Sequence, residues 1–190
     1  MKLSSKKING EYDIVLIQPP LFSPFIDYGL NLHIEKEYWN TMEENSGRLL
    51  GDLPFETSYG ILSIGSYLKS FGYKVKIIVL HLTDYFLRKN QAKGINKTDI
   101  VKILSKYKSK FYGLSVLTIS EKWSNTVTDI IQQLYNEAYI FWSGYFSTKN
   151  DSLILKKNGN IDFIVRNEGE FIIKNILDDF FPKKNWNYIK

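Results

Sequence analysis

Five short apolar runs, separated by turns and by stretches with helical periodicity, constrain this chain more than any other feature. The first run, Asp13–Ile17, is apolar on both faces of a strand, which is typical of a central strand in a parallel sheet. Pro19 and Pro20 follow it, and because proline cannot continue a ladder, the strand must stop there. The other predicted strands are Val75–Leu80, Phe111–Leu117, Tyr139–Trp142 and Phe163–Val165.

The stretches between these runs carry apolar residues three and four positions apart, which predicts amphipathic helices. In the helix Tyr59–Phe71, Gly65 is small in mid-helix and Gly72 is placed to end the helix. Alternating strands and helices predict an α/β fold with a doubly wound parallel five-stranded sheet. The other predicted helices are Asp99–Tyr107 with Thr98 as cap, Trp123–Glu137, a helix or turn at Asp151–Lys157, and Phe171–Phe181, with a turn of helix at Thr83–Arg88 in an irregular connection His81–Asn96.

The 190 residues suffice for one domain with a hydrophobic core, and no internal repeat or linker divides them. We therefore expect a single domain over residues 1–190. A long connection at about 21–57 is rich in aromatic and aliphatic side chains, and Ile34, Tyr38 and Met42 recur every four residues within it. The sequence predicts an ordered insertion over the carboxyl edge of the sheet.

Composition excludes several functional classes. The absence of cysteine excludes disulfides, thiolate zinc sites and an iron–sulfur cluster held by this chain alone, and two histidines make a histidine-based metal site unexpected. The net charge of +5 is spread over scattered lysines without a nucleic-acid-binding motif, so we expect no nucleic-acid partner. Since no apolar run approaches about 20 residues and no apolar core follows the N-terminal lysines, we expect no membrane partner and a cytoplasmic location.

The candidate ligand site is the set of residues that follow the strands, because open α/β sheets bind ligands at that edge. The turn Gln18-Pro19-Pro20 lacks a glycine-rich phosphate-binding pattern, which argues against NAD, FAD, ATP and the usual S-adenosylmethionine methyltransferase domain. The chain also lacks the acidic cluster of a phosphoacceptor receiver domain. The small or polar residues after the later strands are Ser115, Thr118 and Ser120, then Ser143, Gly144 and Tyr145, and finally Asn167, Glu168, Gly169 and Glu170.

The order and spacing of these motifs, over about residues 12–181, resemble the N-terminal cobalamin-binding domain of B12-dependent radical SAM enzymes. The sequence departs from the family pattern at Ser143, in place of the first residue of a double glycine, and at Asn167, in place of the first glycine of a closing D-x-V-V-R-G-E-G-E motif. The acid that usually follows the second strand is also absent, and Leu80-His81 stands there. The matching segments are Pro19-Pro20, Tyr59–Leu62 leading to Gly72–Val75, Gly113-Leu114-Ser115 with Thr118, Ser143-Gly144, and Asp162–Glu170.

The resemblance implies a flavodoxin-like sheet of order 2-1-3-4-5, a Rossmann-like B12-binding fold, with cobalamin on the carboxyl edge. It implies that Ser115 and Thr118 contact the nucleotide tail or the corrin amides. The remaining implied cofactor-binding positions are Pro19 and Pro20 after the first strand, Ser143, Gly144 and Tyr145 along the tail channel, and Asn167, Glu168 and Gly169 on the opposite wall.

The family's cobalamin domain normally precedes a radical SAM barrel with a three-cysteine cluster motif, which this chain lacks. We therefore expect a stand-alone cobalamin-binding module that supports methyl transfer or radical SAM chemistry of a partner, either a radical SAM enzyme or another biosynthetic protein. Whether the chain is itself an enzyme, as a subunit or domain of a B12-dependent radical SAM methyltransferase, stays open. The alternative is a degenerate B12-like fold that acts as a peptide- or protein-binding accessory.

The two histidines and the two glutamates of the last turn are the candidate catalytic or metal-binding side chains, and each also has an ordinary structural interpretation. His33 lies where other B12 proteins carry the cobalt-binding Asp-x-His-x-x-Gly, but the aspartate and glycine are missing, so we interpret it as an ordinary histidine of the insertion. His81 is predicted to be a surface residue at a strand end. Glu168 and Glu170 fit a turn acid and a helix N-terminal acid better than an acid–base pair.

Overall fold

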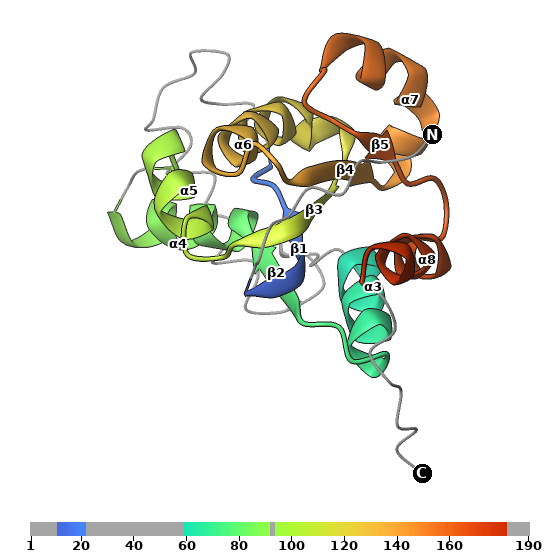
Figure 1. The fold of residues 1–190 in the computed structure, drawn as a ribbon. Coiled ribbons are helices and arrows are strands. Elements are labelled where there is room, and N and C mark those ends of the chain that lie inside the picture. Colours follow the sequence, from blue (N-terminus) through green and yellow to red (C-terminus); the bar gives the residue numbers. More distant parts are fainter. Residues whose placement is uncertain (1–10, 22–58, 92–93, 182–190) are drawn as a thin grey trace, which may run out of the picture.

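The computed structural model describes residues 11–21, 59–91 and 94–181 (Figure 1). The predicted insertion, including His33, therefore lies outside the described residues apart from its first position. Within those ranges the strands form one all-parallel sheet in the order β2-β1-β3-β4-β5, which confirms the predicted α/β class and the flavodoxin-like order. The strands are β1 Tyr12–Gln18, β2 Val75–Val79, β3 Ser109–Ser115, β4 Tyr139–Ser143 and β5 Phe163–Ile164.

Strand β1 lies between β2 and β3, and helices cover both of its faces. Its residue Ile14 pairs with Val75 on one side and with Phe111 on the other. The segment 14–17 is almost completely buried. This position explains why the run is apolar at every residue instead of alternating.

Helices α3 (Tyr59–Ser70) and α8 (Gly169–Phe180) lie side by side on one face of the sheet (Figure 1). A Cβ atom on Gly65 would lie 2.6 Å from Cδ1 of Ile77, so this glycine permits α3 to approach the sheet closely. Their core includes Ile14, Leu16, Ile61, Ile64, Leu68, Phe111, Phe141, Ile173 and Leu177.

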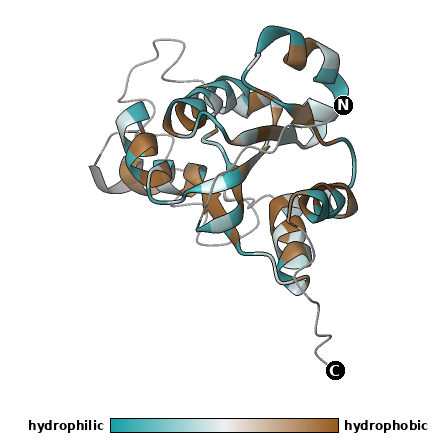
Figure 2. Cartoon of the chain, viewed as in Figure 1, coloured by the Kyte–Doolittle hydropathy of each residue, from teal (hydrophilic) through white to brown (hydrophobic). Residues whose placement is uncertain are grey.

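Helices α4 (Leu80–Gln91), α5 (Lys97–Leu104) and α6 (Glu121–Leu134) lie on the other face. Trp142 of β4 is buried beneath α6, where its indole N–H donates a 2.9 Å hydrogen bond to Oγ1 of Thr128. Helices of both layers carry hydrophobic and hydrophilic stripes (Figure 2), as expected when one side of each packs against a sheet.

The end of α3 confirms the role predicted for Gly72. Its φ is 74°, and its N–H donates to the carbonyl of Lys69 at 2.8 Å. The next N–H, of Tyr73, donates to the carbonyl of Leu68 at 3.2 Å. These two bonds form a Schellman motif, for which glycine is the favoured residue.

The segment after β2 corrects two sequence predictions. Helix α4 begins at Leu80, immediately after the strand, so the connection is mostly helical and not irregular. Its buried side includes Asp84, which accepts a 2.6 Å hydrogen bond from the N–H of Ile95. Because a polar residue takes this buried position, apolar periodicity indicated only the turn Thr83–Arg88 of this helix. His81 is only 5% exposed and is not a surface residue.

Helix α5 has a different cap from the one predicted. Asn96, not Thr98, is the N-cap: its side chain accepts from the N–H of Asp99 at 3.0 Å, and the Asp99 carboxylate accepts from the N–H of Asn96 at 3.2 Å. This capping box moves the helix start to Lys97.

Two further boundaries differ from the prediction near the carboxyl edge. Strand β3 ends at Ser115, not Leu117, and a short 3-10 turn, η1, follows at Thr118–Ser120. Helix α7 spans Tyr145–Lys157 and begins six residues before the predicted Asp151, with a kink where Asn150 has φ −123° and ψ 17°. The predicted segment is therefore the second half of a bent helix.

Candidate functional site

The carboxyl ends of β3 and β4 bring two of the predicted site residues together. Ser115 and Ser143 are partners in the register of these strands, and both are buried. The N–H of Val116 donates to the carbonyl of Ser143 at 2.8 Å, which extends the pairing one step further. The hydroxyl of Ser143 donates to the carbonyl of Leu114 at 3.3 Å. This hydroxyl is thus engaged with the sheet.

The turn after β3 exposes apolar side chains at the same edge. Ser120 organises this turn, since its hydroxyl accepts from the N–H of Leu117 at 2.9 Å and donates to the carbonyl of that residue at 3.0 Å. Leu117, Thr118 and Ile119 are exposed, Ile119 by 53%. Tyr145, after β4, is 73% exposed. We call Leu117, Thr118, Ile119 and Tyr145 the edge rim.

Gly144 occupies the turn between β4 and α7 because no other residue fits there. Its φ is 97°, and a Cβ atom would lie 2.9 Å from the carbonyl oxygen of Val116. Its own carbonyl accepts from the N–H of Thr148 at 3.0 Å, which starts α7. The glycine is therefore required by the backbone and by packing, whatever binds at the edge.

The turn between β5 and α8 contains Asn167, whose φ of 55° lies in the left-handed region. Asparagine tolerates this conformation better than most residues, so it is a physically reasonable substitute for the glycine of the motif that the sequence resembles. Asn167 and Glu168 are exposed. Gly169 is buried, and a Cβ atom there would lie 2.9 Å from Cδ1 of Ile64 on α3.

The two acids of this turn, Glu168 and Glu170, have different structural positions. Glu168 is the N-cap residue of α8 without a side-chain capping bond. Glu170 lies in the first turn of the helix and accepts a 2.6 Å hydrogen bond from the Ser63 hydroxyl of α3. Their positions match the predicted turn acid and N-terminal acid, and a carboxylate at a helix N-terminus is favoured by the helix dipole.

At the end of β1, Pro19 and Pro20 are buried directly after Gln18, whose register partner is Val79 of β2. His81 follows on the first turn of α4. Neither of its ring nitrogens has a hydrogen-bond partner among the residues that the structure describes. Burial lowers the pKa of His81, and the nearby charge of Asp84 opposes this effect. Sequence reasoning missed this residue, although a histidine inside the apolar run Val79–Leu82 was a visible signal.

Neither a metal-binding cluster nor a membrane-spanning helix occurs in the described parts of the chain. Over residues 11–21, 59–91 and 94–181, no three acidic or histidine side chains gather in a way that could hold a metal ion. In those ranges no helix is long and apolar enough to cross a membrane.

Comparison of the chain with protein-family models and with curated proteins gives no match. What defines its class is therefore the fold and the edge: a flavodoxin-like α/β sheet whose carboxyl ends carry buried serines, tight turns and an exposed apolar rim.

Proposed function

We propose that this chain is a stand-alone module that binds a cobalamin-class cofactor at the carboxyl edge and serves methyl transfer or radical SAM chemistry of a partner protein. The observation that carries the proposal is the edge rim, a set of exposed apolar and hydroxyl-bearing side chains in the turns that follow the paired serines Ser115 and Ser143. Ligands of open α/β sheets bind at this edge.

The residues present suit a large planar ring with amide groups at its margin. Leu117, Ile119 and Tyr145 offer apolar contact area to a ring face, and Thr118 offers an exposed hydroxyl to amides. Gly144 and Gly169 leave no open space for a ligand beside them, because atoms of Val116 and Ile64 already fill it. The fit therefore rests on the rim and on the main chain of the turns.

When bound, a cobalamin supplies the transferable methyl group or takes part in the radical chemistry. The role of the chain is then to hold the ring and leave one face open to a partner. The chain contains no cysteine, so an iron–sulfur cluster with cysteine ligands must come from that partner.

The direct test is reconstitution of the purified full chain with hydroxocobalamin, followed by gel filtration. We expect the cobalamin absorbance to elute with the protein in about equimolar amount, because the proposed site binds one cofactor. Elution of protein without this absorbance, with hydroxo-, methyl- and adenosylcobalamin alike, would overturn the proposal.

A variant of the rim tests the location of the site. Ile119→Asp places a charge where the ring face is expected to lie, and we expect binding to weaken about ten-fold or more because that charge loses water on binding. The matched control is Leu155→Asp, which makes the same kind of change at an exposed leucine in the second half of α7. Equal binding by both variants would contradict a site at the rim.

The same exposed side chains favour a second candidate, a degenerate B12-like fold that binds a peptide or protein of a biosynthetic pathway. Exposed apolar groups at a sheet edge also suit a protein interface. This candidate predicts no cobalamin uptake, together with a complex formed on co-expression with the product of a neighbouring gene. Ile119→Asp should weaken that complex and Leu155→Asp should not.

A further inference from the structure

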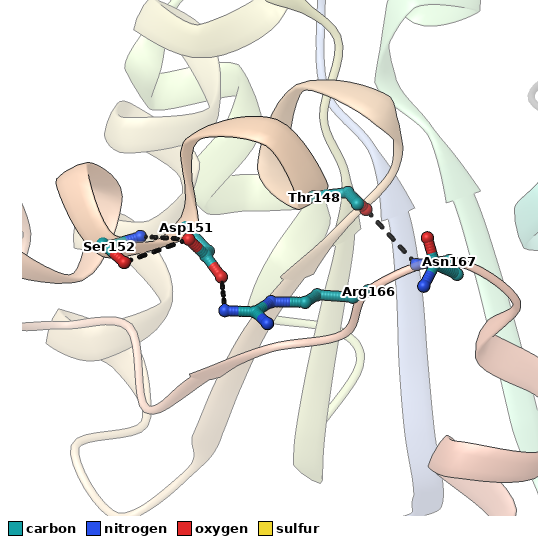
Figure 3. Close-up of polar contacts among 5 residues, drawn as sticks. All are labelled: Thr148, Asp151, Ser152, Arg166 and Asn167. Carbon is teal, nitrogen blue, oxygen red and sulfur yellow. Dashed lines mark hydrogen bonds and ion pairs between the residues drawn. The ribbon is translucent and has the colours of Figure 1, made fainter.

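A polar contact joins helix α7 to the turn between β5 and α8 (Figure 3). The carboxylate of Asp151 forms an ion pair with the guanidinium of Arg166. Next to it, the N–H of Asn167 donates to the hydroxyl oxygen of Thr148 at 3.3 Å. We call these two interactions the α7–turn contact.

The kink in α7 makes this contact possible. Asn150 leaves the helical conformation, and its side chain donates to the carbonyl of Phe146 at 2.9 Å, which closes the first half of the helix. Asp151 then starts the second half, and its Oδ1 accepts from the N–H of Ser152 at 2.5 Å. Its other oxygen, Oδ2, is left to face Arg166.

Apart from the α7–turn contact, the described residues hold this turn mainly at its two ends. Before it, the N–H of Val165 donates to the carbonyl of Trp142 at 2.9 Å, and after it Gly169 packs against Ile64. Between these two anchors, residues 166–168 are exposed, and Asn167 has a left-handed φ. The α7–turn contact therefore acts on a segment, residues 166–168, that buries none of its residues in the core.

The contact joins the two segments that carry predicted site residues. Thr148 is one helical turn after Gly144 and is bonded to its carbonyl. On the other side, Asn167 is followed directly by Glu168 and Gly169. A displacement of the turn relative to α7 would change the spacing between these two predicted walls.

We propose that Thr148 and Asp151 are positioning residues, which hold the Arg166–Glu168 turn at a fixed place relative to the Ser143–Tyr145 turn. Arg166 is 63% exposed at its side chain and Asp151 17%. An ion pair this close to solvent adds at most about 1 kcal/mol to the stability of a fold, so we expect its effect in local opening of the turn and not in global unfolding. This inference rests on the proposed function, since it assigns roles within the same site.

Two variants at position 148 test the hydrogen bond. Thr148→Val keeps the side-chain shape but removes the acceptor, and Thr148→Ser keeps the acceptor. We expect residue-resolved amide exchange of Asn167 to accelerate about five-fold in Thr148→Val, as for the loss of one net hydrogen bond, and to stay at the wild-type rate in Thr148→Ser. Equal rates in all three proteins, or the same acceleration in both variants, would overturn this assignment.

The ion pair is tested with matched aspartate substitutions. Asp151→Asn removes the charge facing Arg166, whereas Asp129→Asn makes the same change at an exposed residue of α6 that accepts a 2.9 Å bond from Asn160. We expect faster exchange at residues 166–168 in Asp151→Asn only. In the wild type, added NaCl should accelerate this exchange because salt screens the pair, and it should not do so in Asp151→Asn. Exchange that is insensitive to Asp151→Asn and to salt would overturn the role of the pair.

Hydroxocobalamin binding separates this inference from the proposed function. If the wild type retains the cofactor, we expect Thr148→Val and Asp151→Asn to bind it several-fold more weakly, with melting temperatures within about 4 °C of the wild type. The controls Thr148→Ser and Asp129→Asn should bind it normally. Unchanged binding in all variants would overturn the positioning role at the site. If the wild type retains no cobalamin, the proposed function fails, and the exchange rates alone decide whether the contact holds the turn.

Discussion

At the scale of residues, the backbone conformation of individual turn residues shapes the carboxyl edge. Asn167 is an example, because its φ of 55° lies in the left-handed region. Asn167→Gly should leave the free energy of unfolding nearly unchanged, because relief of the left-handed conformation is offset by the greater freedom of glycine in the unfolded chain. Asn167→Val should lower it by about 1–2 kcal/mol, since a β-branched residue is strained at positive φ. Urea unfolding of both variants measures the difference, and a valine variant as stable as the glycine variant would contradict the conformation.

His81 should make stability depend on pH. Burial without a hydrogen-bond partner among the described residues lowers its pKa in the folded chain below the usual value of 6.5. The folded state therefore binds fewer protons than the unfolded state, so the free energy of unfolding falls as the pH drops below about 6.5. Between pH 7.5 and 5.5 the free energy of unfolding falls by at most about 1.4 kcal/mol because of this residue. The charge of Asp84 makes the fall smaller, because it raises the pKa of His81 against the effect of burial.

The comparison that isolates this effect is urea unfolding of the wild type and of His81→Phe at both pH values. Phenylalanine is a ring of similar shape that does not titrate. We expect the wild type to lose more stability than the variant on acidification. The same loss in both proteins would show that other groups cause it.

At the scale of elements, helix α5 depends on its capping box. Asn96→Ala removes the side-chain acceptor for the N–H of Asp99 and should lower the free energy of unfolding by about 1 kcal/mol. Thr98→Ala is the matched control, since Thr98 is exposed and lies inside the helix, and its effect should stay within about 0.5 kcal/mol. Thermal or urea unfolding measures both; a larger effect at Thr98 would favour the cap predicted from the sequence.

For the whole molecule, burial of β1 between two helical layers has a testable consequence. Leu16 belongs to the core under α3 and α8, and Ile17 to the core under α4, α5 and α6. Leu16→Ala and Ile17→Ala should each lower the free energy of unfolding by about 2–5 kcal/mol. Leu153→Ala, at an exposed leucine of α7, should change it by less than about 0.5 kcal/mol.

Urea unfolding followed by both tryptophan fluorescence and circular dichroism checks this prediction. A small effect of one core substitution beside a large effect of the other would mean that one helical layer covers β1 only loosely.

Local patterns were sufficient to predict the five strands, the small residue Gly65 within α3 and the end of α3 at Gly72, whereas the order of the strands in the sheet was implied by the family resemblance. Apolar runs bounded by turns predicted all five strands to within about two residues at their ends, and Gly72 predicted the end of α3. These signals are local, because they depend on strand burial and on backbone conformations that few residues adopt. Of the α4 helix only the turn Thr83–Arg88 was predicted, because Asp84 occupies a buried position through a bond to Ile95, eleven residues away in the chain.

The amino-acid sequence by itself therefore determined the succession of strands and helices along the chain and placed small and hydroxyl-bearing residues at the strand ends. Only the tertiary structure decided which of these residues meet: Ser115 beside Ser143, Gly169 against Ile64, and the turn at Asn167 against α7. It also decided that His81 is buried and that Leu117, Ile119 and Tyr145 are exposed. The physical reason is that secondary structure follows local periodicity, whereas contacts between turns depend on the kink at Asn150 and on packing between segments distant in the chain.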